Sequence, residues 1–405
     1  SLKFFLSTFS KTLPTKNWFL SFVAAKIHLF FESKHYLCKI LTIIVNNDKY
    51  KGPKVSLAVK YLIYMLEISI LRKERERVLK GLELRNWGAD EMKVVDQLIG
   101  LDEKRRKFKS DSDELAAASN QKSREIGDLF KSGKREEAEV LRAEVAASKE
   151  TAKELAEGLK AVEDEMTAHL YTIPNIPNDL VPAGNSEEDN FVFKDWPNDL
   201  PDLGAHAVPH WELAKKHELF DLELGVRITG AGFPVYTGKG AKLQRALISF
   251  FLDEATAAGY KEYQVPLMVN SDSATATGQL PDKEGQMYYV EKDDLYLIPT
   301  AEVPVTNIYR GELVEQATLP IKMCGYTPCF RREAGSYGAH VRGLNRVHQF
   351  DKVEIVQIVD PEESYNALQD MLDHVEGLLQ KLELPYRILR LCGGDLTFAS
   401  ALTYD

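Results

Sequence analysis

The sequence contains few cysteines and no glycine-rich nucleotide loop. Its four cysteines are Cys38, Cys324, Cys329 and Cys392, and no two of them have the spacing of a zinc knuckle or a redox motif. Four cysteines in 405 residues do not suggest a disulfide framework, so we predict buried thiols, a reducing cytoplasm and no metal site. Neither a GxGxxG segment nor a P-loop occurs, which gives no support to a Rossmann or Walker nucleotide site.

Arginine is absent from residues 1–64, which carry ten lysines and only two acids, Glu32 and Asp48. Charged residues and histidines interrupt every apolar run of this segment, well short of the about 18 residues of a membrane helix. Transit peptides are usually rich in arginine. We therefore interpret residues 1–64 as an extension without function ahead of a natural start at Met65, with a targeting or membrane-surface segment as the alternative.

Negative charge dominates the rest of the chain. The whole chain has a formal net charge of −10 and residues 1–64 contribute +8, which leaves −18 for residues 65–405. An acidic body argues against a protein that coats nucleic acid indiscriminately. An RNA partner would have to be bound by local basic patches.

Residues 65–172 show the pattern of a helical arm. An apolar seven-residue repeat runs from Val94 to Leu115, and apolar three- and four-residue steps run from Leu155 to Leu170. Residues 131–134 interrupt the pattern with a glycine. Two helices of this kind predict an antiparallel coiled coil that reaches roughly 50 Å at about 1.5 Å per residue. A hairpin packed on the body, or a dimerisation coil, remains the alternative. Basic residues of the first helix favour a contact with phosphate, with a merely solvated face as the alternative: Lys104, Arg105, Arg106, Lys107 and Lys109.

Residues 173–405 are predicted to form a mixed domain. Prolines end the helical region after residue 173, and helices are expected over residues 211–222, 240–259 and 361–384. Alternating apolar runs predict strands, including one over residues 353–358. Hairpin-like connections in place of regular βαβ units favour an antiparallel sheet flanked by helices. The predicted fold class is therefore α+β.

Two of the expected strands, joined by a loop rich in glycine and arginine, carry the strongest functional signal. They hold Arg331 and Glu333 on one side of the loop and Phe350 and Glu354 on the other. Arginine can bind a phosphate with two hydrogen bonds, phenylalanine can stack on a base, and glutamate can hold an ammonium or an exocyclic amine. Together they indicate a site for a nucleotide and an amino acid.

This segment resembles motif 2 of class II aminoacyl-tRNA synthetases, and residues 65–405 are most similar to the seryl-tRNA synthetase family. The other segments follow in the family's order: a helical arm, residues 172–179, a motif 1-like stretch around Pro266, and Thr300-Ala301-Glu302. The resemblance implies a class II catalytic domain preceded by a coiled-coil arm, and a homodimer formed through motif 1. It implies an ATP-dependent, cytoplasmic serine–tRNA ligase that forms seryl-adenylate and transfers serine to the 3′ end of tRNA(Ser), with tRNA(Sec) as a further substrate and no membrane association.

The resemblance also assigns roles to single residues. Arg331 would bind the α-phosphate of ATP, Glu333 the adenine amino group, and Phe350 would stack on adenine. The catalytic set is Arg331, Glu333 and Glu354. The ATP-binding set is Arg331, Arg332, Glu333 and Phe350. The serine-binding set is Thr300, Ala301, Glu302 and Glu354. The tRNA-binding set is Lys104, Arg105, Arg106 and Arg342. Without the resemblance, Thr300 and Glu302 would be read as a helix cap, and Arg342 and Arg346 as surface arginines in salt bridges.

The sequence stops at Asp405, within an expected strand. In the family a Glu-x-Ser-Ser segment that binds ATP and its Mg²⁺, and then motif 3, follow this point. The resemblance therefore implies that the Mg²⁺ ligands lie in a missing C-terminal segment. It also implies that the chain as written is a fragment, which is not expected to catalyse adenylation without motif 3. The alternative function is a non-catalytic, synthetase-derived tRNA-binding or regulatory protein, and a third reading is a coiled-coil scaffold.

Overall fold

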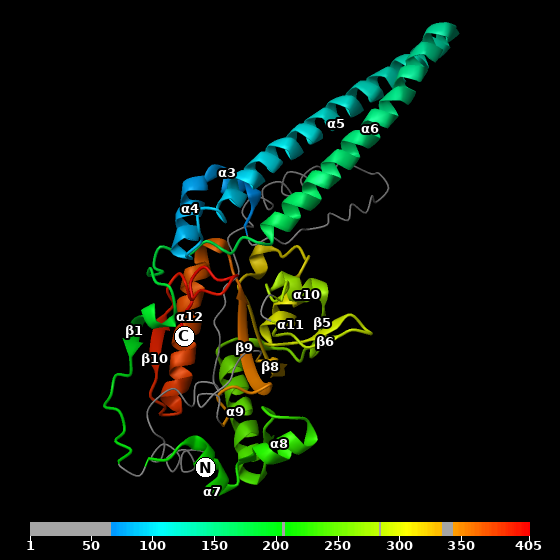
Figure 1. Cartoon of the computed structure of the whole chain (residues 1–405). Helices are drawn as coiled ribbons and strands as arrows, with labels where there is room; N and C mark the ends of the chain where they lie inside the picture. Colours follow the sequence, from blue (N-terminus) through cyan, green and yellow to red (C-terminus); the bar gives the residue numbers. More distant parts are fainter. Residues whose placement is uncertain (1–65, 205–206, 283–284, 334–342) are drawn as a thin grey trace. The chain divides into compact units, whose positions relative to one another are not determined.

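The computed structural model describes residues 66–204, 207–282, 285–333 and 343–405, which form two compact units. We call residues 66–177 the arm unit and the described residues from 178 onward the core unit (Figure 1). Residues 1–64, which include Cys38, lie outside the described residues, as do Met65 and Arg342, so the structure does not test the predictions made for them. Within the described ranges no helix has the length and apolar character needed to cross a membrane. The cysteines of these ranges, Cys324, Cys329 and Cys392, are buried free thiols, as predicted.

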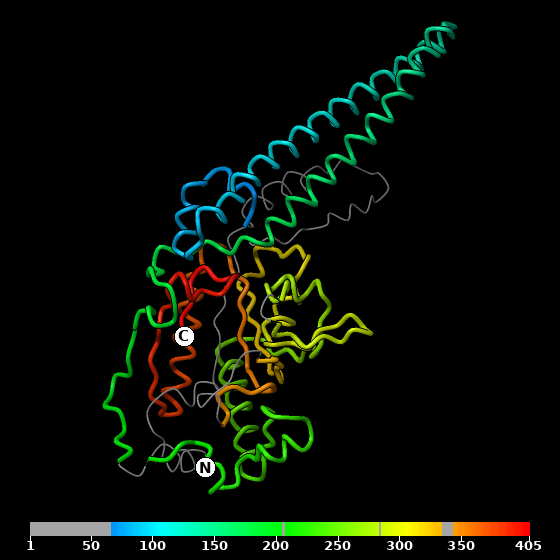
Figure 2. Tube along the Cα trace, in the orientation of Figure 1, coloured from blue at the N-terminus to red at the C-terminus, as the bar shows by residue number. Residues whose placement is uncertain are grey.

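The arm unit is a helical hairpin with a small helical base, which confirms the two predicted helices (Figure 2). The turn contains Gly133 at φ 79°, a left-handed conformation that glycine adopts without steric cost. Nearer the base, a Cβ added to Gly158 would lie 2.8 Å from the ring of Phe108, so the two helices approach closely there. The helices are α3 (Ile68–Lys73), α4 (Arg75–Leu84), α5 (Lys93–Lys131) and α6 (Arg135–Leu170).

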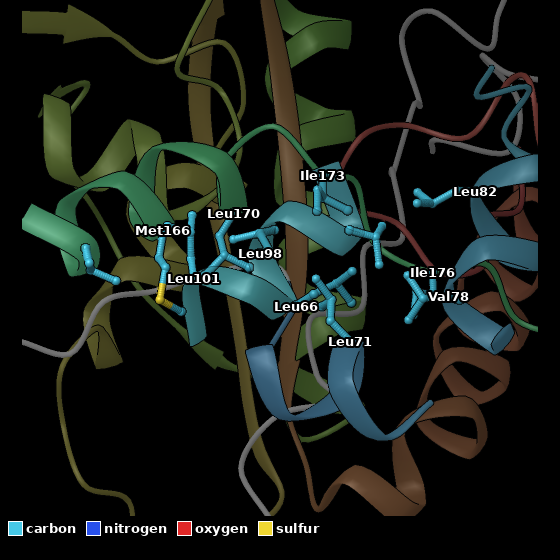
Figure 3. Packing of buried hydrophobic residues seen from close by; sticks show 12 residues of the cluster. Leu66, Leu71, Val78, Leu82, Leu98, Leu101, Met166, Leu170, Ile173 and Ile176 are labelled. Atoms are coloured by element: carbon cyan, nitrogen blue, oxygen red, sulfur yellow. The ribbon is translucent and has the colours of Figure 1, made fainter. Parts of the chain in front are cut away.

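A single apolar cluster holds the base of the arm together (Figure 3). On α5 the buried apolar positions are Val95, Leu98 and Leu101, and Val94, the predicted start of the seven-residue repeat, packs against the cluster while partly buried. The packed face of α5 therefore includes the predicted positions Val94, Leu101 and Phe108, with Val95 and Leu98 between them. The residues of the cluster labelled in Figure 3 are Leu66, Leu71, Val78, Leu82, Leu98, Leu101, Met166, Leu170, Ile173 and Ile176.

A buried carboxylate, Asp102, lies beside this cluster and binds three arginines. Its Oδ2 accepts a hydrogen bond from Arg72 at 2.5 Å and lies 3.0 Å from the Nε of Arg106, while its Oδ1 accepts from Arg105 at 2.8 Å. Burial raises the pKa of Asp102, but the hydrogen bonds from Arg105 and Arg72 outweigh burial and hold this pKa below its ordinary value. Two arginines predicted to contact tRNA therefore also stabilise the base of the arm.

The core unit combines short sheets with helices, and its α+β class is as predicted. Its α-helices are α7 (His210–His217), α8 (Leu222–Ile228), α9 (Gly238–Ala257), α10 (Ser271–Ala276), α11 (Glu302–Thr306) and α12 (Ser364–Lys381). Its strands are β1 (Phe191–Asp195), β2 (Phe220–Asp221), β3 (Val235–Tyr236), β4 (Lys261–Glu262), β5 (Met268–Asn270), β6 (Tyr289–Val290), β7 (Leu295–Leu297), β8 (Ile321–Phe330), β9 (Gln349–Ile358) and β10 (Arg387–Arg390).

The long antiparallel pair β8–β9 organises the core unit (Figure 1). Its register is continuous from the Ile321–Ile358 pair to the Phe330–Gln349 pair, and β4 adds to β8 in parallel. Side chains alternate between the two faces of a strand. Val353 packs against α9 and α12 on one face, whereas Met323 and Val356 pack against α11 on the other. We call the α11 side the site face.

The prediction of one helix over residues 211–222 is wrong in its second half. α7 ends at His217 because Glu218 adopts a left-handed conformation at φ 52°. Residues 220–221 then form β2, and the carboxylate of Asp221 accepts a hydrogen bond from the N–H of Leu224 at 2.9 Å, which starts a new helix, α8. Cap chemistry thus overrides a continuous apolar pattern.

We predict that Asp102→Asn lowers the free energy of unfolding of the arm unit by about 1–3 kcal/mol, because it removes the charge that neutralises three arginines. The folded pKa of Asp102 lies below its ordinary value of 3.8. The contribution is therefore present above that pH and is lost as the pH falls through the folded pKa.

Urea unfolding of the wild type and of Asp102→Asn, at neutral and at strongly acid pH, tests this prediction. Asp113→Asn is the matched control, since Asp113 lies on the same helix, is 65% exposed and pairs only across the surface with Lys109. The control should change stability by less than about 0.5 kcal/mol. Equal losses in the two variants would contradict the role of Asp102.

Candidate active site

Three polar side chains meet on the site face and are almost completely buried. Thr300, just before α11, donates from its hydroxyl to Oε2 of Glu354 at 2.9 Å. Lys352 donates from Nζ to the same hydroxyl at 2.8 Å and pairs with the same carboxylate oxygen at 2.8 Å. The side chains of Lys352 and Glu354 are 6% and 2% exposed, so a charged pair is held there away from water. We call these residues the buried triad.

The strand period explains how β9 supplies two members of the triad. Phe350, Lys352 and Glu354 are two residues apart and share the site face. Asp351 faces the other way, where its carboxylate accepts hydrogen bonds from the hydroxyl of Tyr326, at 2.5 Å, and from the side-chain amide of Gln244 on α9. The hydrogen bonds of Asp351, on the face opposite the site face, therefore hold β9 in place beneath the site.

Thr300 is placed by its own backbone connections. The N–H of Phe330, at the end of β8, donates to the carbonyl of Ile298 at 2.9 Å, which ties the segment before α11 to the sheet. The N–H of Glu302 donates to the hydroxyl of Thr300 at 3.3 Å. The N-cap residue of α11 is Ala301 and no side chain caps this helix, so the helix-cap reading of Thr300 is wrong, and its hydroxyl belongs to the buried triad. Ala301 and Glu302, the other predicted serine contacts, are buried beside it.

Arg331 and Phe350 lie next to the triad and contact each other. The guanidinium carbon of Arg331 is 5.3 Å from the centroid of the Phe350 ring, within the range of a cation–π contact. Its Nε donates to the carbonyl of Pro299 at 3.3 Å. A fixed cation beside an aromatic face can bind a phosphate and a base together.

Glu333 is held at the rim of this arrangement. It has φ 45°, and its carboxylate forms an ion pair with Arg346 at 3.1 Å, on the far side of the connecting loop. Arg346 therefore does form the salt bridge expected of a surface arginine. Arg332 is exposed, and its N–H donates to the carbonyl of Gln286 at 2.9 Å.

His210, at the first turn of α7, fixes the end of the loop between β8 and β9. The N–H of Leu344 donates to its Nε2 at 2.9 Å. Gly343 has φ 76°, and a Cβ there would lie 2.1 Å from the same nitrogen, so only glycine fits. Burial lowers the pKa of His210 to about 4, which keeps the ring neutral and able to accept.

Sequence reasoning missed Lys352 and His210. The period of β9 could have identified Lys352, because it lies midway between two residues already assigned to the site. No local signal marks His210, since its partner lies 134 residues away in the sequence. The structure thus brings together Thr300, Arg331, Phe350 and Glu354, and it places Lys104, Arg105 and Arg106 in the arm unit.

The described residues include no group of three or more histidine, cysteine, aspartate or glutamate side chains that could hold a metal ion. The donor set at the site suits other ligands. Arg331 offers a cation for a phosphate and Phe350 an aromatic face for a base. The buried triad offers hydroxyl and carboxylate groups for a small polar molecule.

Comparison with known proteins gives this arrangement a family context. Residues 65–177 match the model of the seryl-tRNA synthetase N-terminal domain, and residues 288–405 match that of the tRNA synthetase class II core domain (G, H, P, S and T). Serine–tRNA ligases of Salinibacter ruber and Chlorobium phaeovibrioides are each 46% identical to the chain, covering 84% of it and 79% of each relative. The seryl-tRNA synthetase of Pyrococcus horikoshii, complexed with ATP, is similar in structure, with a TM-score of 0.75, 30% identity, and coverage of 84% of this chain and 80% of that one.

We predict that the imidazole of His210 titrates at about 4 in the folded protein, against 6.5 ordinarily. The unfolded chain takes up this proton first, so the stability contributed by neutral His210 is lost as the pH falls from 6.5 towards about 4. An NMR titration of the imidazole protons measures the value, and His210→Asn identifies the resonance by removing it. A His210 resonance that titrates at the ordinary value would contradict the assignment.

Proposed function

The chain belongs to the seryl-tRNA synthetase family of ATP-dependent aminoacyl-tRNA ligases, and we propose that it joins L-serine to tRNA(Ser) at the site just described. One observation carries the proposal. A buried triad suited to a small hydroxyl compound lies beside a cation and an aromatic ring suited to ATP, on one face of β8–β9. These side chains also favour the ligase over a non-catalytic RNA-binding relative, which would need none of them.

In the first step a carboxylate oxygen of serine attacks the α-phosphorus of ATP. The new bond joins that oxygen to phosphorus, the bond from the α-phosphorus to the oxygen bridging to the β-phosphate breaks, and pyrophosphate leaves. Arg331 binds the α-phosphate and stabilises the charge that develops there. Phe350 stacks on adenine, Glu333 accepts from its amino group, and Arg332 lies beside them. Arg331, Glu333 and Glu354 are the proposed catalytic set.

Serine binds at the deeper end of the site. Glu302 holds its ammonium group, Thr300 and Glu354 contact the rest of the amino acid, and Ala301 lines the same segment. A site whose buried polar groups need a hydroxyl partner rejects alanine by about 10⁴-fold or more. Mg²⁺ bound with ATP would neutralise charge on its phosphates.

In the second step a hydroxyl at the 3′ end of tRNA attacks the carbonyl carbon of seryl-adenylate, and AMP leaves. Residues 65–172 form the arm that grips tRNA(Ser) through Lys104, Arg105 and Arg106, and residues 173–405 hold the catalytic chemistry. Arg342, which lies outside the described residues, contacts the acceptor end. The same recognition extends to tRNA(Sec).

A homodimer and a cytoplasmic location complete the proposal. The motif 1-like segment around Pro266 leaves Leu267 and Met268 exposed at 38% and 45%, which suits a face covered by a second copy. Free thiols at Cys324, Cys329 and Cys392 suit a reducing compartment.

The proposed reaction predicts serine-dependent exchange of pyrophosphate into ATP. Across a panel of amino acids, serine should exceed alanine by about 10⁴-fold in kcat/KM, because the buried triad loses a partner with alanine. A preference for another amino acid would refute the substrate assignment.

Arg331→Ala should lower the kcat of the same exchange by about 10²-fold or more, because the cation at the α-phosphate is lost.

For the arm, we predict that Lys104→Glu combined with Lys107→Glu weakens tRNA(Ser) binding by about 10-fold or more at low salt, because two cations near phosphate are reversed. Both lysines are exposed, so melting temperature and pyrophosphate exchange should not change. The control is Lys153→Glu on α6, at an exposed lysine that pairs with Glu150. Filter binding at several salt concentrations measures the affinity, and an unchanged salt dependence would contradict the contact. Arg105 and Arg106 are left intact because they also hold Asp102.

A further inference from the structure

Lys352 has no role in the reaction as proposed above, yet it is the most deeply placed cation at the site. Its side chain is 6% exposed, and its ammonium contacts both the hydroxyl of Thr300 and the carboxylate of Glu354. A buried carboxylate without a partner costs several kcal/mol, and the ammonium of Lys352 is the partner that offsets this cost for Glu354. The two charges cancel, and the buried triad has no net charge.

Charge balance decides which side chains the triad can accept. A neutral triad can exchange hydrogen bonds with a neutral hydroxyl. It offers no net attraction to a second ammonium, which would also lie close to the ammonium of Lys352 and be repelled by it. Without Lys352 the same carboxylate would attract a cation.

We propose that Lys352 is a specificity-determining residue, which by neutralising Glu354 makes the side-chain end of the amino acid site select a hydroxyl over an ammonium. This inference rests on the proposed function, because it takes Thr300 and Glu354 as serine contacts. The compound excluded by this device is 2,3-diaminopropionate, in which an amine replaces the hydroxyl of serine at nearly the same size.

Calorimetric binding of non-hydrolysable sulfamoyl-adenosine mimics to the full chain tests the proposal. The seryl, alanyl and 2,3-diaminopropionyl mimics are compared under mildly acidic conditions in which the second amine is protonated. Wild type should bind the seryl mimic at least about 10²-fold more tightly than the diaminopropionyl mimic. In Lys352→Met this ratio should fall by about 10-fold or more, whereas Lys352→Arg keeps the charge and should keep the ratio within about threefold.

A second variant keeps the proposal falsifiable if Lys352→Met does not fold, as judged by circular dichroism. Glu354→Gln leaves the charge of Lys352 unbalanced. The preference of this variant for the seryl over the diaminopropionyl mimic should therefore rise instead of falling. If Lys352→Met weakens both mimics by the same factor, or if Glu354→Gln lowers the ratio, Lys352 only supports the fold and the proposal is wrong. Equal affinity of wild type for the seryl and alanyl mimics is a different failure, which removes the proposed function itself.

Discussion

The antiparallel pairing of β8 with β9 is the constraint on which the rest of the core unit depends. Ten consecutive pairs fix one register, from Ile321–Ile358 to Phe330–Gln349. A slip by one residue would move every side chain to the opposite face. Phe350, Lys352 and Glu354 would then face α9 and α12, and Asp351 and Val353 would lie on the site face. The apolar packing of Val353 against those helices therefore protects the chemistry of the other face.

Buried charge is handled differently in the two units. In the arm unit one carboxylate, Asp102, binds three arginines that are each partly exposed, so water shares the excess positive charge. In the core unit Lys352 and Glu354 are both buried and balance each other. The first arrangement suits a structural anchor at the surface of the arm. The second suits a site in which any uncompensated charge would change what binds.

Much of this molecule could be predicted from its sequence, and the failures have physical causes. The two long helices followed from their apolar period, and Arg331, Phe350 and Glu354 followed from the chemistry of their side chains around one loop. The break after α7 was missed because a single left-handed residue, Glu218, and the cap at Asp221 outweigh a continuous apolar pattern. His210 could not be found because its partner is distant in sequence, and Lys352 was passed over although strand alternation pointed to it. Local periodicity predicted helices and strands, whereas contacts between segments distant in the sequence became visible only in the three-dimensional structure.

The close approach of Gly158 to the ring of Phe108 separates a well-packed part of the arm from a part with little core. On the base side the helices share a continuous apolar cluster that ends at Phe108. Most residues on the far side of this contact are exposed or only half buried, so they add reach without adding much core. Whole turns could be inserted into or removed from both helices beyond Gly158 while the base stays unchanged. The length of the arm could therefore change, in evolution or by design, without rebuilding the apolar cluster that holds its two helices together at the base.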